Sequence, residues 1–123
     1  MALPETLLGA IALMILIGAT MGGVVTALLL LTNKSPPIKI DLGLLHGRMG
    51  VVGITLLVVT IFMGDERNLS IAPAIGAFIM TAIGGATLYF LIRRKGILPK
   101  MIILLHGSFA VASLAILIFG FTI

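Results

Sequence analysis

Residues 5–32 read ETLLGAIALMILIGATMGGVVTALLLLT, and Glu5 is the only charged residue in this run. A helix needs about 20 residues, at about 1.5 Å each, to cross a hydrocarbon core about 30 Å thick. The run is longer than that, and it does not alternate between apolar and polar residues as a membrane barrel strand does. Because lipid offers the backbone no hydrogen-bond partner, a membrane-spanning helix is predicted here. A cleaved secretory signal is not expected, since no Lys or Arg precedes the run and an apolar signal core has only about 7–15 residues.

Three further apolar runs follow, over residues 40–64, 69–92 and 98–122. Charged and turn-forming residues separate the four runs, and we place the helix ends at Asn33-Lys34-Ser35-Pro36-Pro37, Gly64-Asp65-Glu66-Arg67-Asn68 and Arg93-Arg94-Lys95-Gly96. Short connections make neighbouring helices antiparallel. The sequence therefore predicts an all-α, integral membrane, up-down-up-down four-helix bundle that forms one domain over residues 1–123.

The composition excludes several classes of protein. Sixty per cent of the 123 residues are hydrophobic and 10% are charged, whereas soluble domains carry about 25% charged residues. No Cys is present, which excludes disulfides, thiolate ligands, cysteine-held iron–sulfur clusters and covalent C-x-x-C-H haem attachment. The net charge is +4, but the charged residues lie between the apolar runs rather than on a folded face that also carries aromatic residues. No nucleic-acid binding is therefore expected. No catalytic triad or nucleotide-binding glycine loop is found, and no catalytic residue is assigned.

The chain also reads as a duplicated helical hairpin, with repeats over about residues 1–64 and 65–123. The matched segments are Gly22-Gly23 with Gly84-Gly85, and Leu44-Leu45-His46-Gly47 with Leu104-Leu105-His106-Gly107. Parallel repeats of this kind are related by a pseudo-two-fold axis along the membrane normal. The two histidines of the chain therefore occupy equivalent positions.

These histidines, His46 and His106, are the strongest candidates for a binding site. Each lies about six to eight residues into its helix, so both are expected at one depth. Their helices occupy diagonal corners of the bundle, about 11–14 Å apart when neighbouring axes are about 8–10 Å apart. Two imidazoles that bond one iron from opposite sides, at about 2 Å each, span this width. The spacing predicts one haem b per chain, with His46 and His106 as axial ligands.

Glycines surround these positions. We expect the two diglycines, Gly22-Gly23 and Gly84-Gly85, to give a porphyrin edge room on the intervening helices, and Gly47 and Gly107 to keep the helix slim beside each ligand. A competing interpretation is that small residues only let membrane helices pack closely. Arg48 lies about 200° around the helix from His46 and should point away from the iron. It is either an interfacial anchor or the partner of a haem propionate, a role for which Lys39, Arg93 and Lys100 compete.

Other interpretations remain open. The histidines can instead tie helices together, through a carbonyl one turn earlier or a threonine such as Thr26 or Thr87, in a cofactor-free assembly or interaction subunit. A small proton-coupled transporter fits the length, but all four acidic residues lie at helix ends or in loops. Two histidines supply only half of a tetrahedral zinc or copper site. Met49 is a candidate ligand only if the histidine pair fails.

A four-helix membrane bundle with a histidine on each of two helices, and glycines on the other two, resembles the small b-type cytochromes of bacterial inner membranes. The resemblance concerns the layout and rests on His46, His106 and the two diglycines. It implies non-covalent haem b and electron exchange with quinone or a partner protein, and a membrane oxidoreductase if the chain is an enzyme. Many four-helix b cytochromes look to have two haem pairs stacked through the bilayer, whereas this chain has histidines for one.

The charge distribution predicts the orientation. The first and third connections carry six basic residues, against Arg67 alone on the opposite side: Lys34, Lys39, Arg93, Arg94, Lys95 and Lys100. The positive-inside rule then places these connections in the cytoplasm and both termini outside. The expected partners are the lipid bilayer and quinone or an acidic redox protein, and association into a homo-oligomer is left open.

Overall fold

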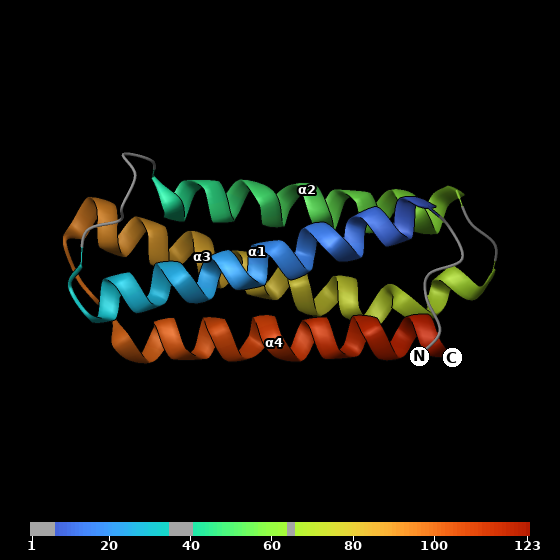
Figure 1. Ribbon diagram of the computed structural model, residues 1–123. Helices are drawn as coiled ribbons and strands as arrows, with labels where there is room; N and C mark the ends of the chain where they lie inside the picture. Colours follow the sequence, from blue (N-terminus) through green and yellow to red (C-terminus); the bar gives the residue numbers. More distant parts are fainter. Residues whose placement is uncertain (1–6, 35–40, 64–65) are drawn as a thin grey trace.

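The computed structural model describes residues 7–34, 41–63 and 66–123, with the backbone alone for residues 66–68. Its elements are α1 (Leu7–Leu31), α2 (Leu42–Met63), the short 3-10 helix η1 (Glu66–Ile71), α3 (Ala72–Lys95) and α4 (Lys100–Thr122) (Figure 1). Four long apolar helices pack as antiparallel hairpins, which confirms the predicted all-α four-helix bundle. The 3-10 helix between the two hairpins was not predicted.

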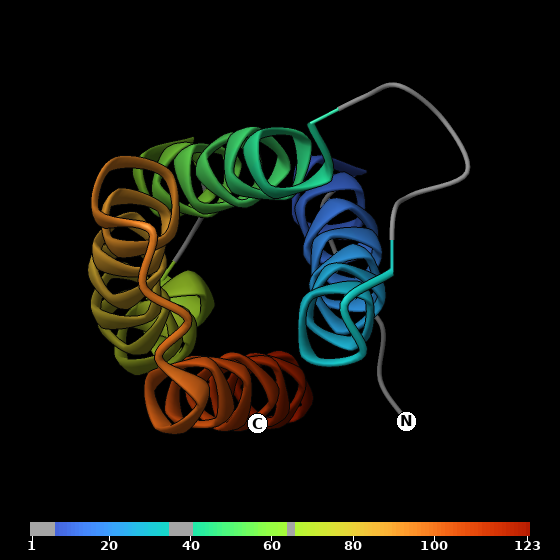
Figure 2. The ribbon, with the colours of Figure 1, turned by 90° about the vertical axis from the view of Figure 1, so that its left-hand side faces the viewer.

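The four helices occupy the corners of a square in chain order (Figure 2). Among the described residues, each helix lies close to its two neighbours in this order, and the backbones of the diagonal pairs do not approach each other closely. The hairpins α1–α2 and α3–α4 pack more extensively within themselves than against each other. This topology places α2 and α4, which carry the two histidines, on diagonally opposite corners.

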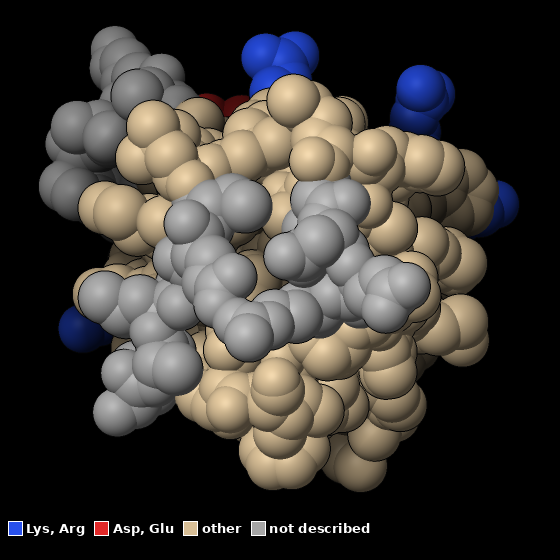
Figure 3. All heavy atoms as spheres, turned by 90° about the vertical axis from the view of Figure 1, so that its right-hand side faces the viewer, with Lys and Arg blue, Asp and Glu red and all other residues tan. Residues whose placement is uncertain are grey.

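The chain is a multi-pass membrane protein with four candidate spans. Each of the four long helices is long and apolar enough to cross a membrane. Large apolar side chains cover the outside of the bundle, and Phe62 and Leu7 are 83% and 78% exposed. Figure 3 views the end that carries the termini, where Lys and Arg side chains of the described residues are seen only around the rim. Lipid is therefore the solvent that this surface requires.

Left-handed residues end the first helix of each hairpin. Beyond α1, Asn33 has φ 53°, and the amide of Lys34 donates to the carbonyl of Leu29 at 2.9 Å. Beyond α3, Gly96 has φ 63°, and the amide of Ile97 donates to the carbonyl of Leu91 at 3.0 Å. Glycine and asparagine adopt this conformation at low cost and so satisfy the last carbonyls of a helix. Both left-handed residues lie in the breaker segments identified in the sequence; α3 ends within its segment, whereas α1 ends at Leu31, two residues before its segment.

The apolar core lies in one half of the bundle. The core cluster is Ala12, Leu13, Leu16, Leu57, Ile71, Ala74, Ile75, Phe78 and Leu117. All of these residues belong to the half that carries the chain termini. In the other half, Leu88 and Ile103 are the large apolar side chains that the structure buries, and the two histidines lie among small residues. The half that holds the histidines therefore buries fewer large apolar side chains.

Asp41 joins the two hairpins at the basic end. Its carboxylate accepts the Leu44 amide at 3.1 Å, which caps α2, and lies 2.5 Å from the Arg93 guanidinium of α3. The hydroxyl of Tyr89 donates to the same carboxylate at 3.4 Å. Arg93, a predicted candidate for a propionate, is thus paired with a carboxylate of the chain itself. The hydrogen bond from Arg93, and to a smaller extent that from the Leu44 amide, holds the pKa of Asp41 below its ordinary value.

Two substitutions of Asp41 should distinguish the contribution of the ion pair to stability from that of the helix cap. Asp41→Asn keeps an acceptor for the Leu44 amide but loses the charge, and we expect a loss of less than about 1 kcal/mol, because the pair is solvent-exposed. Asp41→Ala should cost about 1 kcal/mol more through the lost cap. Since the folded-state pKa is lowered, the charge-dependent part is present above about pH 4 and disappears as the pH falls further. Unfolding in detergent at pH 7 and pH 3 measures both effects, and equal losses in the two variants would contradict the assignment.

Candidate functional site

His46 projects from α2 into the bundle and binds α1. Its Nδ1–H donates to the carbonyl of Ala19 at 2.7 Å, so the partner lies on the neighbouring helix rather than one turn earlier on α2. The predicted alternatives, Thr26 and Thr87, bond carbonyls of their own helices instead. A ring proton held at Nδ1 leaves Nε2 with a free lone pair. Histidines that bind metals in proteins usually have this arrangement.

The second glycine of each diglycine makes room for an imidazole ring. A Cβ atom on Gly23 would lie 2.7 Å from Cε1 of His46, and one on Gly85 would lie 2.9 Å from Cε1 of His106. Each histidine therefore lies against the diglycine of its own hairpin, and the two hairpins repeat the same contact. The room predicted here for a macrocycle edge is thus taken, at these two positions, by the imidazoles.

The two imidazole rings meet inside the bundle, across the diagonal between α2 and α4. Their centroids are 6.0 Å apart and their planes are inclined by 82°. Two rings that bind one iron at about 2 Å, with each nitrogen about 1.1 Å from its ring centre, have centroids about 6 Å apart. The observed centroid separation is close to this value.

The environment of His106 differs from that of His46. Its Nδ1 atom is buried and makes no hydrogen bond of standard geometry among the described residues, although the backbone of Thr81 interacts with the ring. The repeat alignment puts Thr81 at the place of Ala19, and Ser113 at the place of Gly53. The hydroxyls of Thr81 and Ser113 lie 3.2 Å apart in the interior between α3 and α4.

No family model, curated protein or solved structure matches this chain. The functional assignment therefore depends on the residues themselves. Among the described residues, no group of three or more His, Cys, Asp and Glu side chains is placed to hold a metal ion. In the interior of the described bundle, the candidate binding groups are therefore the two imidazoles.

The other predicted site residues lie around this pair in different ways. A Cβ on Gly84 would be 3.7 Å from Nδ1 of His106, whereas one on Gly22, Gly47 or Gly107 would meet nothing within 4 Å. Arg48 is exposed, as the helical spacing predicted, while His46 on the same helix is half-buried. The methyl group of Met49 lies 3.4 Å from the position of a Cβ on Gly18 of α1. The roles of the glycines and Arg48 toward a cofactor stay predictions.

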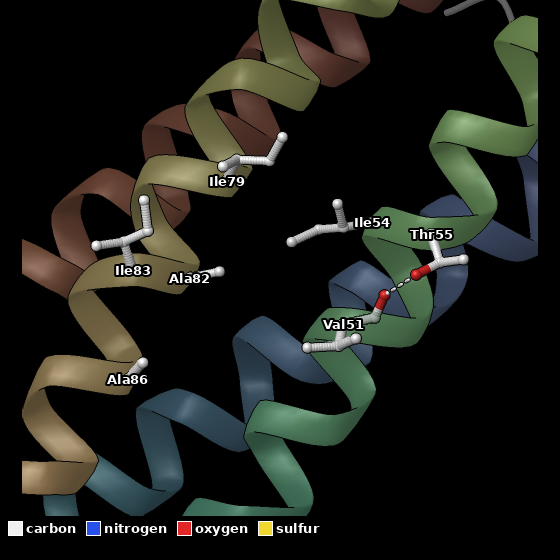
Figure 4. A pocket seen from close by; sticks show the side chains of 7 residues that line it. All are labelled: Val51, Ile54, Thr55, Ile79, Ala82, Ile83 and Ala86. Atoms are coloured by element: carbon white, nitrogen blue, oxygen red, sulfur yellow. Dashed lines mark hydrogen bonds between the residues drawn. The ribbon is translucent and has the colours of Figure 1, made fainter.

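An apolar groove between α2 and α3 was not predicted (Figure 4). It measures about 310 Å³ and is lined by Val51, Ile54, Thr55, Ile79, Ala82, Ile83 and Ala86. The Thr55 hydroxyl, the one polar side chain of this lining, donates to the carbonyl of Val51 at 2.8 Å. The groove lies where the two hairpins face each other, and its residues are mostly exposed to the surrounding lipid.

Proposed function

We propose that this protein is a membrane haem b protein, with His46 and His106 as axial ligands of one haem per chain, that carries electrons to or from quinone or a partner protein. The observation that carries the proposal is the meeting of the two imidazoles, 6.0 Å between centroids, inside the bundle. When bound, the haem would supply exchange between ferric and ferrous iron. The spacing of the rings and the chemistry of their nitrogens support this group.

Three features of the chain would serve this role. Ala19 holds the ring of His46 through Nδ1, which fixes the ring and leaves the lone pair of Nε2 free. Gly23 and Gly85 let both rings lie close to α1 and α3. Fewer large apolar side chains are buried in the half that holds the histidines than in the other half. Intramembrane ionisable residues are costly and are commonly functional, which also favours a ligand role.

Absorption spectra of the purified protein, produced with haem available, test the proposal. We expect a Soret band with visible bands that sharpen on dithionite reduction, as two neutral imidazole ligands give. One haem per chain should be found by pyridine haemochrome analysis. A wild-type protein that purifies as a folded, monodisperse sample without a Soret band would refute the proposal.

A second candidate function, a cofactor-free assembly or interaction subunit, is favoured by one observation. Two rings at 6.0 Å and 82° also have the geometry of an edge-to-face pair that packs helices together. In that case His46→Ala and His106→Ala should each cost about 1 kcal/mol, with a coupling of about 0.5–1.5 kcal/mol from the ring contact.

A double-mutant cycle on His46 and His106 separates these two functions. The free energy of unfolding is measured for wild type, both single alanine variants and the double variant, in protein produced with and without haem. Ligation predicts a coupling that rises when haem is supplied, since loss of either ligand disrupts one site. Packing predicts the same coupling in both preparations. Equal coupling energies in the two preparations would therefore show that the histidines pack helices together and do not bind haem.

The orientation is proposed from the basic residues at the α1–α2 and α3–α4 connections. These connections should lie in the cytoplasm, and the basic rim should attract an acidic partner or anionic lipid by about 1 kcal/mol per nearby Lys or Arg. Because the chain has no Cys, Ser35→Cys and Asn68→Cys each give one unique thiol. In intact cells, a membrane-impermeant thiol reagent should label position 68 and spare position 35. Labelling of position 35 but not of position 68 would show that the chain has the opposite orientation.

A further inference from the structure

Arg48 is a charged side chain at membrane depth that has no carboxylate partner among the described residues. It lies six residues beyond Leu42, the first residue of α2, which is about 9 Å along the helix. Its side chain is exposed, and no ion pair or side-chain hydrogen bond joins it to another described residue. Because a charge inside the membrane is costly, such a residue normally pairs with an opposite charge or reaches the interface.

The acidic residues of the chain are not available to Arg48. Three of the four belong, by their place in the sequence, to the opposite end of the helices: Glu5, Asp65 and Glu66. Asp41, the fourth, lies at the same end as Arg48, but its carboxylate already binds the Arg93 guanidinium of α3. An anionic partner for Arg48 therefore has to come from outside the chain.

The apolar groove between α2 and α3 opens beside Arg48. Residues three and four positions apart share one face of a helix, so Arg48, Val51 and Thr55 follow one another along the same face of α2. Val51 and Thr55 line the groove. The positive charge of Arg48 and the apolar groove thus occupy adjoining parts of one lipid-facing surface.

The register of α2 against α3 puts Arg48 at the mouth of this groove. Asp41 and Arg93 are in contact, which places them at one depth. Arg48 lies seven residues after Asp41, and Ala86 lies seven residues before Arg93, so these two residues also share a depth in antiparallel helices. Ala86 is the lining residue of α3 nearest to the basic end, and it lies at the lower end of the groove in Figure 4.

The lining of the groove suits a hydrocarbon chain. Six of its seven side chains are aliphatic, and the hydroxyl of Thr55 is satisfied by the carbonyl of Val51. One leaflet contains about 15 Å of hydrocarbon, half of a core about 30 Å thick. From Leu42 to Thr55 the helix rises about 20 Å, so an acyl chain that starts near the basic end reaches along the groove.

Charge favours a lipid over a second copy of this chain as the occupant. The described residues at this end carry several further cations, namely Arg93, Arg94, Lys95 and Lys100, and one carboxylate that is already paired. A copy of the chain at the same depth would therefore bring cations toward Arg48. An anionic phospholipid brings a phosphate and an acyl chain together, and a guanidinium matches the geometry of a phosphate.

We propose that Arg48 and the groove between α2 and α3 form a binding site for one anionic phospholipid, whose phosphate accepts hydrogen bonds from Arg48 and whose acyl chain lies in the groove. The side chain of a helical residue tilts toward the N-terminus of its helix, which in α2 is the basic end. The long side chain of Arg48 therefore extends toward the phosphates of the nearer leaflet. The site does not depend on the proposed haem function.

Native mass spectrometry of the purified full chain in detergent tests the proposal by titration with added lipid. Phosphatidylglycerol is the probe, and phosphatidylcholine with the same acyl chains is the comparison, because a choline cation neutralises its phosphate. Wild-type protein should bind phosphatidylglycerol at least tenfold more tightly than phosphatidylcholine. Glycerol 3-phosphate, which has the phosphate without the acyl chains, should not bind measurably.

Two pairs of variants test the two parts of the site. Arg48→Gln should lower the affinity for phosphatidylglycerol about 10–100-fold, as expected for lost hydrogen bonds to a charged group. Lys100→Gln removes one charge at the same end, from α4, and should lower it by about fivefold at most, the general attraction of one surface cation. Ala82→Phe should fill the groove and weaken the binding of both lipids at least tenfold. Ala112→Phe, at an exposed position of α4, should leave both unchanged.

Several outcomes would overturn the proposal. Equal affinity of the wild-type protein for the two lipids would overturn it, and this comparison needs no variant to fold. Equal losses in Arg48→Gln and Lys100→Gln, both checked for a monodisperse helical state, would show only a general attraction to the basic end. A wild-type dimer that Ala82→Phe converts to a monomer would assign the groove to a second copy of the chain. A protein that binds no haem but prefers phosphatidylglycerol would refute the haem function and support this site.

Discussion

Under the proposed haem function, Gly23→Ala is expected to remove most of the haem from the protein. The added methyl group would lie 2.7 Å from Cε1 and 3.1 Å from Nε2 of the His46 ring, so the ring must move. Any such movement breaks or bends the 2.7 Å hydrogen bond to Ala19, which orients the ring. Loss of an orienting partner weakens metal binding about 10–100-fold. Haem affinity, measured by titration of the haem-free protein, should fall by that factor.

Gly18→Ala is the matched control on the same helix. Its methyl group would lie 3.4 Å from the end of the flexible Met49 side chain, a contact that Met49 can relieve. Alanine is also the better helix former, by about 1 kcal/mol, so neither variant should weaken α1 itself. If Gly18→Ala and Gly23→Ala bind haem equally well, the contact between His46 and Gly23 has no role in ligation.

The fold could be predicted because lipid restricts the alternatives so strongly. Apolar runs of sufficient length, separated by breakers such as Asn33 and Gly96, leave a bundle of antiparallel helices as the economical solution. Short connections then place consecutive helices on neighbouring corners of the square, and this puts α2 and α4 on a diagonal. The expectation that the two histidines face each other follows from the same reasoning and from their equal depth.

The details of the site could not be predicted, because they depend on groups that a sequence does not display. The acceptor for His46 is a backbone carbonyl, which every residue carries, and only the packing of α1 on α2 selects that of Ala19. The ion pair between Asp41 and Arg93 depends on how the hairpins meet, so the sequence offered Arg93 as a propionate partner instead. The unequal filling of the two halves likewise depends on which apolar side chains turn inward, and all four helices are apolar on every side.

Gly120→Ala should cause a large loss of stability at a site away from the histidines. Here a Cβ would lie 2.7 Å from the carbonyl oxygen of Ser70 and 3.4 Å from Cα of Ile71, which are backbone atoms of η1. The Ser70 hydroxyl donates to the Gly120 carbonyl, and Ile71 is fully buried in the core cluster. Because backbone cannot rotate away as a side chain can, η1 and α4 must separate.

Overpacking of this kind costs about 1–3 kcal/mol. Gly76→Ala on α3 is the control, since a Cβ there meets nothing within 4 Å and the position is exposed. Reversible unfolding in mixed micelles should give a lower free energy for Gly120→Ala and an unchanged or slightly higher one for Gly76→Ala. Because Gly120 and the histidines lie in opposite halves of the bundle, Gly120→Ala should still bind haem under conditions where it is folded. A stability equal to that of Gly76→Ala would show that the contact between η1 and α4 does not stabilise the bundle.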